Sequence, residues 1–433
     1  MIALIKALQV ILALSLLIFI HELGHFTWAK IFGIRVEKFF LFFDIGGRKL
    51  ASWKWGETEF GIGWLPLGGY CKISGMVDES MDMEQLRSEP KSWEYRSHPA
   101  WHRMFVLAGG VLNNFLFAIV AYCIIMGVWG KSHISNDDTR IYVNELSYEM
   151  GFRTGDRILK FDDYRPRNFE MLQADLARRN VRKATVLRGN DTLDIYIDRN
   201  YIGDVMNSPG VFGLALPFVV DSVQQGSANS ALLHRDDRIV SINGEPTEYL
   251  QDARAVLEKC PGTVAEAFVI RAQGDTVQEN LAVDSLGRIG IFCRMPSIEY
   301  ERYTGWKVIP AGLRHTGEVI SSYLDDLRLL ATPSTGAYKS VGSFIAIGQV
   351  MPESWDWMQF LNILALLSIM LAVMNLIPIP GLDGGHLLIT LGEMITGKKP
   401  SDKFLYVTQL IGMVLLIALM LLAFGNDIGR LIH

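Results

Sequence analysis

The segment ALQVILALSLLIFIHELGHFTWA, which runs from Ala7 to Ala29 between two lysines, decides how this chain is organised. It is long and apolar enough to span the hydrocarbon core of a bilayer, and Glu22 is its only formally charged residue. An ionisable group at that depth is costly, so it indicates either a functional site or a partner inside the protein. The sequence therefore predicts a membrane-spanning helix that carries a polar site.

The polar site is the pattern HELGH at residues 21–25. Residues four apart project from one face of an α-helix, so His21 and His25 can bind one Zn²⁺ while Glu22 lies beside the open coordination position as a general base. This set of residues is typical of metal-dependent peptide-bond hydrolysis. One alternative is a chance match on a helix surface, but charged residues without a function would be costly to insert into a membrane. The other is a secretory signal peptide, but no small-residue cleavage site follows the apolar segment.

Length and composition agree with a membrane protein that also has water-soluble parts. The chain has 433 residues, of which 50% are hydrophobic and 20% are charged. Three further segments without a formal charge are long enough to span a bilayer; they are Met104–Trp129, Met358 to about Pro380, and Phe404–Phe424. Buried core helices are the alternative. The net charge is -5 and no basic surface is concentrated, so nucleic acid is not an expected partner.

Basic residues beside the predicted spans give the orientation of the chain. Lysines and arginines favour the cytoplasmic side, and they gather after the first span, before the second, and between the third and fourth: Lys30, Arg35, Lys38, Arg96, Arg103, Lys398, Lys399 and Lys403. The long segment between the second and third spans is then extracytoplasmic. The HELGH motif lies toward the cytoplasmic side.

The extracytoplasmic segment contains a tandem repeat. MGFRTGDRILKFDD (150–163) and ALLHRDDRIVSING (231–244) share a turn, an Asp-Arg-Ile sequence and a short strand, and each copy is followed by a predicted helix, Phe169–Arg178 or Glu248–Lys259. At this length the pair resembles two PDZ domains, which bind an extended segment or a chain end by adding a strand to a sheet edge. Residues 210–214 are either the carboxylate-binding loop of the second copy or an ordinary glycine turn.

A zinc site needs a third protein ligand, and the third span supplies a candidate. It ends in NLIPIPGLDGGH (375–386), where the prolines must break the helix and the glycines allow close backbone approach. Broken helices at membrane depth are tolerated only where they line a cavity or are buried in protein. Asp383 is therefore the candidate third ligand, and a solvated residue at the end of a span is the alternative.

These motifs together resemble the site-2 protease family of intramembrane zinc metalloproteases, and within it the bacterial regulator-of-sigma-E type. The resemblance implies that His21, His25 and Asp383 are zinc ligands and that Glu22 is the base. It also implies that Asn375 holds substrate. Residues 110–114 lack the proline that the family usually has there, but they keep Asn114. We assign Asn114, Gly61 and Gly63 to substrate binding as well. Residues 60–70 are similar to the family's membrane-re-entrant β element, which presents an edge to an unwound substrate; a soluble hairpin is the alternative.

The predicted fold is a polytopic α-helical membrane protein with four transmembrane helices, a membrane-associated β element and two extracytoplasmic PDZ-like α+β domains. Its predicted parts are 1–30, the first span; 31–103, a cytoplasmic loop with the β element at about 58–73; 104–130, the second span; 131–209 and 210–299, the PDZ-like domains; 300–357, an amphipathic linker; 358–382, the third span; 383–403, a cytoplasmic loop; and 404–425, the fourth span. Cys260 and Cys293 fall in the second repeat and could pair in an oxidising compartment.

The resemblance implies regulated proteolysis within the bacterial inner membrane. The expected partners are the lipid bilayer, single-pass membrane substrates such as anti-sigma factors after a first cut or signal-peptide remnants, and peptide or chain-end ligands of the PDZ-like domains. Two other classes are a PDZ scaffold with an inactive metal site and a metal transporter. The scaffold leaves the intact HELGH and Asp383 unexplained. A transporter needs further ionisable residues along several spans, and the second and fourth spans have none.

Overall fold

The computed structural model describes residues 1–76, 89–208, 210–332 and 342–432, which fall into two compact units. The first unit, here the membrane unit, contains Met1–Lys131, Arg302–Leu324 and the C-terminal part of the chain. The second contains Ser132–Glu301 and the end of helix α8. The predicted loop 31–103 and linker 300–357 extend over residues 77–88 and 333–341, which lie outside the described residues.

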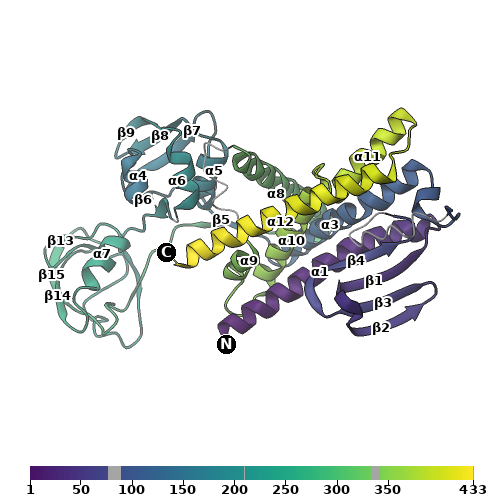
Figure 1. The fold of residues 1–433 in the computed structure, drawn as a ribbon. Coiled ribbons are helices and arrows are strands. Elements are labelled where there is room, and N and C mark those ends of the chain that lie inside the picture. The colour runs from purple at the N-terminus through teal and green to yellow at the C-terminus, as the bar shows by residue number, and fades with distance from the viewer. Residues whose placement is uncertain (77–88, 209, 333–341, 433) are drawn as a thin grey trace. The chain divides into compact units, whose positions relative to one another are not determined.

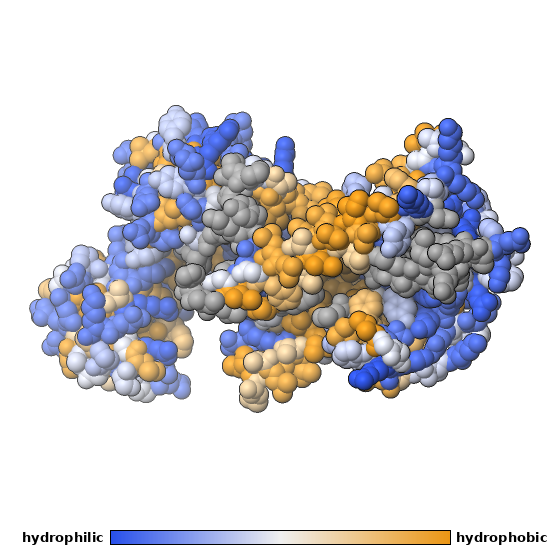
Figure 2. Space-filling model, viewed as in Figure 1, coloured by the Kyte–Doolittle hydropathy of each residue, from blue (hydrophilic) through white to orange (hydrophobic). Residues whose placement is uncertain are grey.

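Four helices of the described chain are long and apolar enough to cross a membrane, and they lie where the four spans are predicted. They are α1 (Ile2–Ile31), α3 (Ala100–Val128), α10 (Trp357–Leu376) and α12 (Asp402–Ile432). The third span is shorter than predicted: α10 ends at Leu376, because Pro378 disfavours a helical conformation for Ile377, whose ψ is 136°. Figure 2 shows hydrophobic surface concentrated over these long helices, which is typical of lipid-facing segments.

Helices α1 and α3 approach each other closely at two glycines. A Cβ atom on Gly24 would lie 2.1 Å from the carbonyl oxygen of Gly109, so no other residue fits there without a shift of the helices. Small residues at such crossings let helix backbones meet in membranes. Helix α10 packs on α3 as well, where the Ser368 hydroxyl donates to the carbonyl oxygen of Asn114 at 2.9 Å.

A four-stranded sheet packs beside α1 in the membrane unit (Figure 1). Its strands are β1 (Val36–Phe43), β2 (Lys49–Trp55), β3 (Thr58–Gly63) and β4 (Leu65–Ile73). Their spatial order is β2-β3-β1-β4, with β1 and β3 parallel and the other pairs antiparallel. Among the described residues, β2 and β4 are therefore the outer strands of this sheet.

Three further helices complete the membrane unit. They are α8 (Val308–Leu330), whose last residues group with the other unit, α9 (Phe344–Val350) and α11 (Asp383–Thr396). Helix α8 is amphipathic, as predicted for the linker. Near its start Trp306, Ile309 and Leu313 are exposed, whereas Gly312 packs against Cys123 of α3.

The second unit contains two lobes, each with its own hydrophobic core. Lobe 1 consists of β6 (Ile141–Val143), α4 (Glu145–Glu149), β7 (Arg157–Phe161), α5 (Leu172–Arg178), β8 (Lys183–Arg188), β9 (Asp191–Tyr196), α6 (Tyr201–Asn207) and β10 (Phe212–Leu214). Lobe 2 consists of β11 (Val220–Val223), β12 (Arg238–Ile242), β13 (Glu245–Pro246), α7 (Leu250–Leu257), β14 (Val264–Ile270), β15 (Thr276–Ala282) and β16 (Ile291–Cys293). Strands β5 (Lys131–Ile134) and β17 (Ile298–Glu301) pair with each other.

The boundary between the two lobes lies later in the sequence than we predicted. Val211 and Phe212 are buried in the core of lobe 1, and β10 pairs with β6. The first residue of the second core is Phe218. The boundary between 209 and 210 therefore cuts through lobe 1, and residues 210–214 do not belong to the second copy. The glycine-rich appearance of this segment suggested a loop, but its apolar residues pair with a distant strand.

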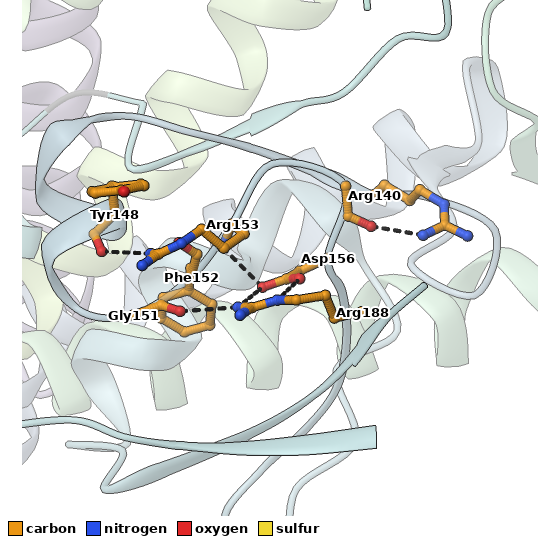
Figure 3. Close-up of polar contacts among 8 residues, drawn as sticks. Arg140, Tyr148, Gly151, Phe152, Arg153, Asp156 and Arg188 are labelled. Carbon is orange, nitrogen blue, oxygen red and sulfur yellow. Dashed lines mark hydrogen bonds and ion pairs between the residues drawn. The ribbon is translucent and has the colours of Figure 1, made fainter. Parts of the chain in front are cut away.

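The aspartate of the Asp-Arg-Ile repeat has the same structural role in both lobes. In lobe 1 the buried Asp156 carboxylate accepts two hydrogen bonds from Arg188, both at 2.8 Å, and one from the backbone N–H of Arg153 (Figure 3). Arg188 also donates to the carbonyl oxygen of Gly151. A buried carboxylate needs such partners, because an unpaired charge in the core is costly.

Lobe 2 has a corresponding arrangement, except that Arg271 gives one hydrogen bond to the aspartate and uses Nη2 to bind Glu279. Asp237 accepts from Arg271 at 2.5 Å and from the backbone N–H of His234, three residues earlier. Arg271 also donates to the carbonyl oxygen of Leu232, five residues before the aspartate, as Gly151 is before Asp156. The two lobes are thus copies of one structural unit, as the sequence repeat predicted.

None of the four cysteines forms a disulfide, so the pairing of Cys260 with Cys293 that the sequence allowed is not formed. Burial raises the pKa of Cys293 to about 11. A thiol with so high a pKa carries little thiolate near neutral pH and reacts slowly.

Candidate metal centre

Two histidines and one aspartate converge inside the membrane unit. The Nε2 atoms of His21 and His25, one turn apart on α1, are 3.2 Å from each other. The Oδ2 atom of Asp383 lies 3.2 Å from Nε2 of His21 and 3.4 Å from Nε2 of His25. Among the residues that the structure describes, this is the one group of three or more potential ligands that could hold a metal ion.

Asp383 reaches the histidines because the chain turns back after α10. It is the first residue of α11, and Gly381, with φ of 91°, adopts a left-handed conformation just before it. A Cβ atom on Gly384 would lie 2.4 Å from the carbonyl oxygen of Ile377. The glycines after Asp383 therefore let the first turn of α11 lie directly on the broken end of α10.

Helix α3 supports both imidazoles from the opposite side. Nδ1 of His25 donates to the carbonyl oxygen of Val106 at 2.8 Å, which leaves the lone pair of Nε2 directed at the site. The Nδ2 atom of Asn114 lies 3.2 Å from Nδ1 of His21, and when the side-chain amide is turned by 180° its oxygen accepts the Nδ1–H in the same way. A Cβ atom on Gly110 would lie 2.5 Å from Cε1 of His21 and 2.6 Å from Nε2 of His25.

This donor set fits a zinc ion. Two imidazole nitrogens and one carboxylate oxygen form the three-ligand set of catalytic zinc sites, which leave a further position open. The Oδ2 atom of Asp383 is buried and has no hydrogen-bond partner apart from these imidazoles, and the Nε2 atom of His25 presents a lone pair to it. Lone pairs that face a carboxylate repel it unless a cation lies between them.

Glu22 lies next to this group and lines the same cavity. The cavity has a volume of about 560 Å³ and is bounded by the candidate ligands, by the end of α10 and by strand β4. A backbone hydrogen bond from Cys71 on β4 orients the Glu22 carboxylate. A carboxylate beside an open metal position can accept a proton from water and return it to a leaving group.

The predicted substrate-binding residues occupy different places. Asn375 lines the cavity, and its amide nitrogen lies 3.5 Å from Nε2 of His21. Asn114 is fully buried against His21 instead, so it does not face the cavity.

Gly61 and Gly63, which we predict to bind substrate, do not lie at an edge of the described sheet. Both lie in β3, which pairs with β2 on one side and with β1 on the other, so its backbone has no free edge. A Cβ atom on Gly61 would collide with the Phe40 ring, which explains the glycine by packing. The sheet borders the cavity mainly through β4, at Gly68, Gly69, Tyr70, Cys71, Lys72 and Ile73, and also through Lys38 and Phe43 of β1.

The sequence did not reveal the glycines at the crossing of α1 and α3. Gly24 and Gly109 were visible as small residues in apolar helices, which is the ordinary signal of a close helix contact. Which glycines meet depends on how the two helices cross, and a single sequence does not contain that information.

The fold and the site together define a membrane-embedded metallopeptidase. The model of peptidase family M50 matches residues 9–419. The Regulator of sigma-E protease RseP of Escherichia coli (strain K12) is 31% identical over 97% of this chain and 98% of its own length. The Regulator of sigma E protease of Salmonella typhi is 30% identical and a Putative zinc metalloprotease of Vibrio cholerae 27%, each over 97% of this chain and 98% of the relative. The chain belongs to peptidase family M50 and is a zinc metalloprotease, as the motifs predicted.

Proposed function

We propose that this protease cleaves peptide bonds inside the transmembrane segments of other membrane proteins, with His21, His25 and Asp383 as its zinc ligands and Glu22 as its base. The observation that carries the proposal is the convergence of the three donor atoms between helices that are apolar enough to span a membrane. A site at that depth is suited to a substrate that lies in the membrane rather than to a water-soluble one.

The chemistry divides between the metal and the chain's own residues. A bound Zn²⁺ supplies a more acidic water and polarises the scissile carbonyl. Glu22 accepts the proton of the attacking water and passes it to the leaving amine. Asn375, at the edge of the cavity, hydrogen-bonds the substrate near the cut.

A transmembrane helix hides its carbonyl groups in internal hydrogen bonds, so the substrate must unwind before it is cut. Strand β4 supports this step. It is an edge strand, and residues 68–73 border the cavity that contains Glu22. An unwound segment that pairs with β4 would satisfy its backbone groups beside the metal site.

The orientation follows from the basic residues that flank the helices. They support an orientation with the active site toward the cytoplasmic side of the bacterial inner membrane and the two lobes outside the cytoplasm. We assign the lobes to PDZ-like modules that bind peptides or chain ends, and α8 to the membrane interface. Substrates would be single-pass proteins, such as anti-sigma factors after a first cut or remnants of signal peptides.

The test is to map the cut. Membranes that contain the protease and a single-pass reporter should yield a product whose new end, read by mass spectrometry, falls within the apolar segment of the reporter. Asp383→Asn should abolish that product. A cut in the soluble part of the reporter, or one that persists in the variant, would refute the proposal.

A further inference from the structure

Helices α3 and α11 are joined by a buried ion pair. Arg103 of α3 and Glu393 of α11 are 8% and 9% exposed, and Nη2 of Arg103 donates to Oε1 of Glu393 at 2.5 Å. Nε of Arg103 also donates to the carbonyl oxygen of His98 at 3.1 Å. Neither residue lines the cavity that contains Glu22, so the pair has no direct part in the chemistry.

The pair lies on the same face of α3 as the groups that hold the histidines. Arg103 precedes Val106 by three residues, and Gly110 and Asn114 follow at intervals of four. This spacing places all four positions on one side of a helix. Val106 fixes His25, Asn114 contacts His21, and Gly110 makes room for both rings.

Through Glu393 the same face of α3 also holds α11. Asp383 begins this helix, and Glu393 follows ten residues later, or about 15 Å along the axis. The helix is otherwise held by polar contacts from His386 to Gln409 of α12 and from Thr390 to Tyr95. Of these three contacts, only the one between Arg103 and Glu393 joins two oppositely charged side chains.

We infer that Arg103 and Glu393 are positioning residues for Asp383: the pair fixes α11 against the face of α3 that orients His21 and His25, and so sets the distance between the third ligand and the other two. This inference rests on the proposed role of Asp383 as a zinc ligand. When the pair is broken, α11 shifts and zinc is left with two well-placed ligands.

The test measures zinc release from the purified full-length protein into a chromogenic chelator. Glu393→Gln and Arg103→Gln should each speed release by about tenfold or more, which is the usual effect of losing a group that orients a ligand. The double exchange Arg103→Glu with Glu393→Arg should slow release again. Glu318→Gln is the matched control, because it breaks the pair of Lys131 and Glu318, which does not touch α11.

The decisive arm repeats Glu393→Gln in an Asp383→Asn background. If the pair acts through Asp383, the substitution has no further effect there. An equal effect in both backgrounds, or unchanged release in both single variants, would overturn the inference. If a single variant does not fold, zinc release from the charge-exchanged protein is compared with release from the native protein instead, again in both backgrounds. If Asp383→Asn alone leaves release unchanged, Asp383 is not a ligand, and the proposed metal site fails together with the inference.

Discussion

Three backbone or side-chain groups of one helix determine where the two histidines of the metal site point. Val106 and Asn114 bind the ring nitrogens that face away from the metal, and Gly110 leaves room for the rings. Such partners of metal ligands fix the tautomer and raise ligand basicity. At the scale of single residues, the three side chains that converge, His21, His25 and Asp383, could be predicted as candidate ligands from the HELGH and LDGG motifs. Their supports could not, because they depend on which turn of α3 faces α1.

Gly110→Ala should remove zinc and activity. The new methyl group would lie within 2.6 Å of both imidazole rings, and overpacking of this kind costs about 1–3 kcal/mol and displaces side chains. Zinc content per folded protein is the measurement. Gly425→Ala in α12 is the control, because its Cβ atom meets nothing within 4 Å. Full zinc content in Gly110→Ala would contradict the close contact.

Asn114→Ala should lower zinc affinity by about tenfold, because the ring of His21 loses the partner on Nδ1. A chelator titration measures this change. Asn375→Ala offers the contrast, since Asn375 faces the cavity and its loss should raise KM more than it weakens zinc binding. If Asn114→Ala raises KM and leaves zinc affinity unchanged, then Asn114 binds substrate as the sequence suggested.

At the scale of elements, the sequence predicted helices better than strand order. The four apolar spans were found from length and charge alone, and only the end of α10 was placed too late, beyond the proline that breaks it. The β element was also predicted, but its strands do not lie in the sheet in the order in which they follow one another along the chain. Because β3 pairs in parallel with β1, the glycines of β3 lie inside the sheet and β4 lies at the edge.

Helix-destabilising residues in a substrate should favour cleavage, because the segment must leave its helix to pair with β4. Replacing a glycine or a proline near the cut by leucine should slow cleavage, since these residues cost about 1 and 3 kcal/mol relative to alanine within a helix. Cleavage rates of paired reporters test this, with the same exchange two turns away as a control. Equal rates for all reporters would mean that unwinding does not limit the reaction.

At the scale of the whole molecule, the chain separates into a membrane unit with the site and a second unit with two repeated lobes. The repeat could be predicted because each copy carries Asp-Arg-Ile ahead of a strand, and the aspartate of each copy, Asp156 or Asp237, pairs with an arginine later in its lobe. The boundary between the lobes could not, since the sequence does not show that β10 pairs with β6.

Deletion of Ile141–Ser297, which removes both lobes, should leave an enzyme that cuts substrates with intact extracytoplasmic domains. The reason is steric: two folded lobes on the side that we propose to be extracytoplasmic would exclude bulky substrates and admit trimmed ones. Cleavage of a full-length and a trimmed reporter, compared before and after the deletion, measures this selectivity. If the native chain and the deleted chain prefer the trimmed reporter equally, the lobes do not act as a size filter.

The most direct test of the account is Glu22→Gln, which keeps the shape of the side chain and removes the base. The native chain should cut a single-pass reporter in membranes. The variant should keep its zinc, because Glu22 is not a proposed ligand, and should lose about a hundredfold or more of the cleavage rate. Cleavage by the zinc-loaded variant at the native rate would contradict the assignment of Glu22 as the base.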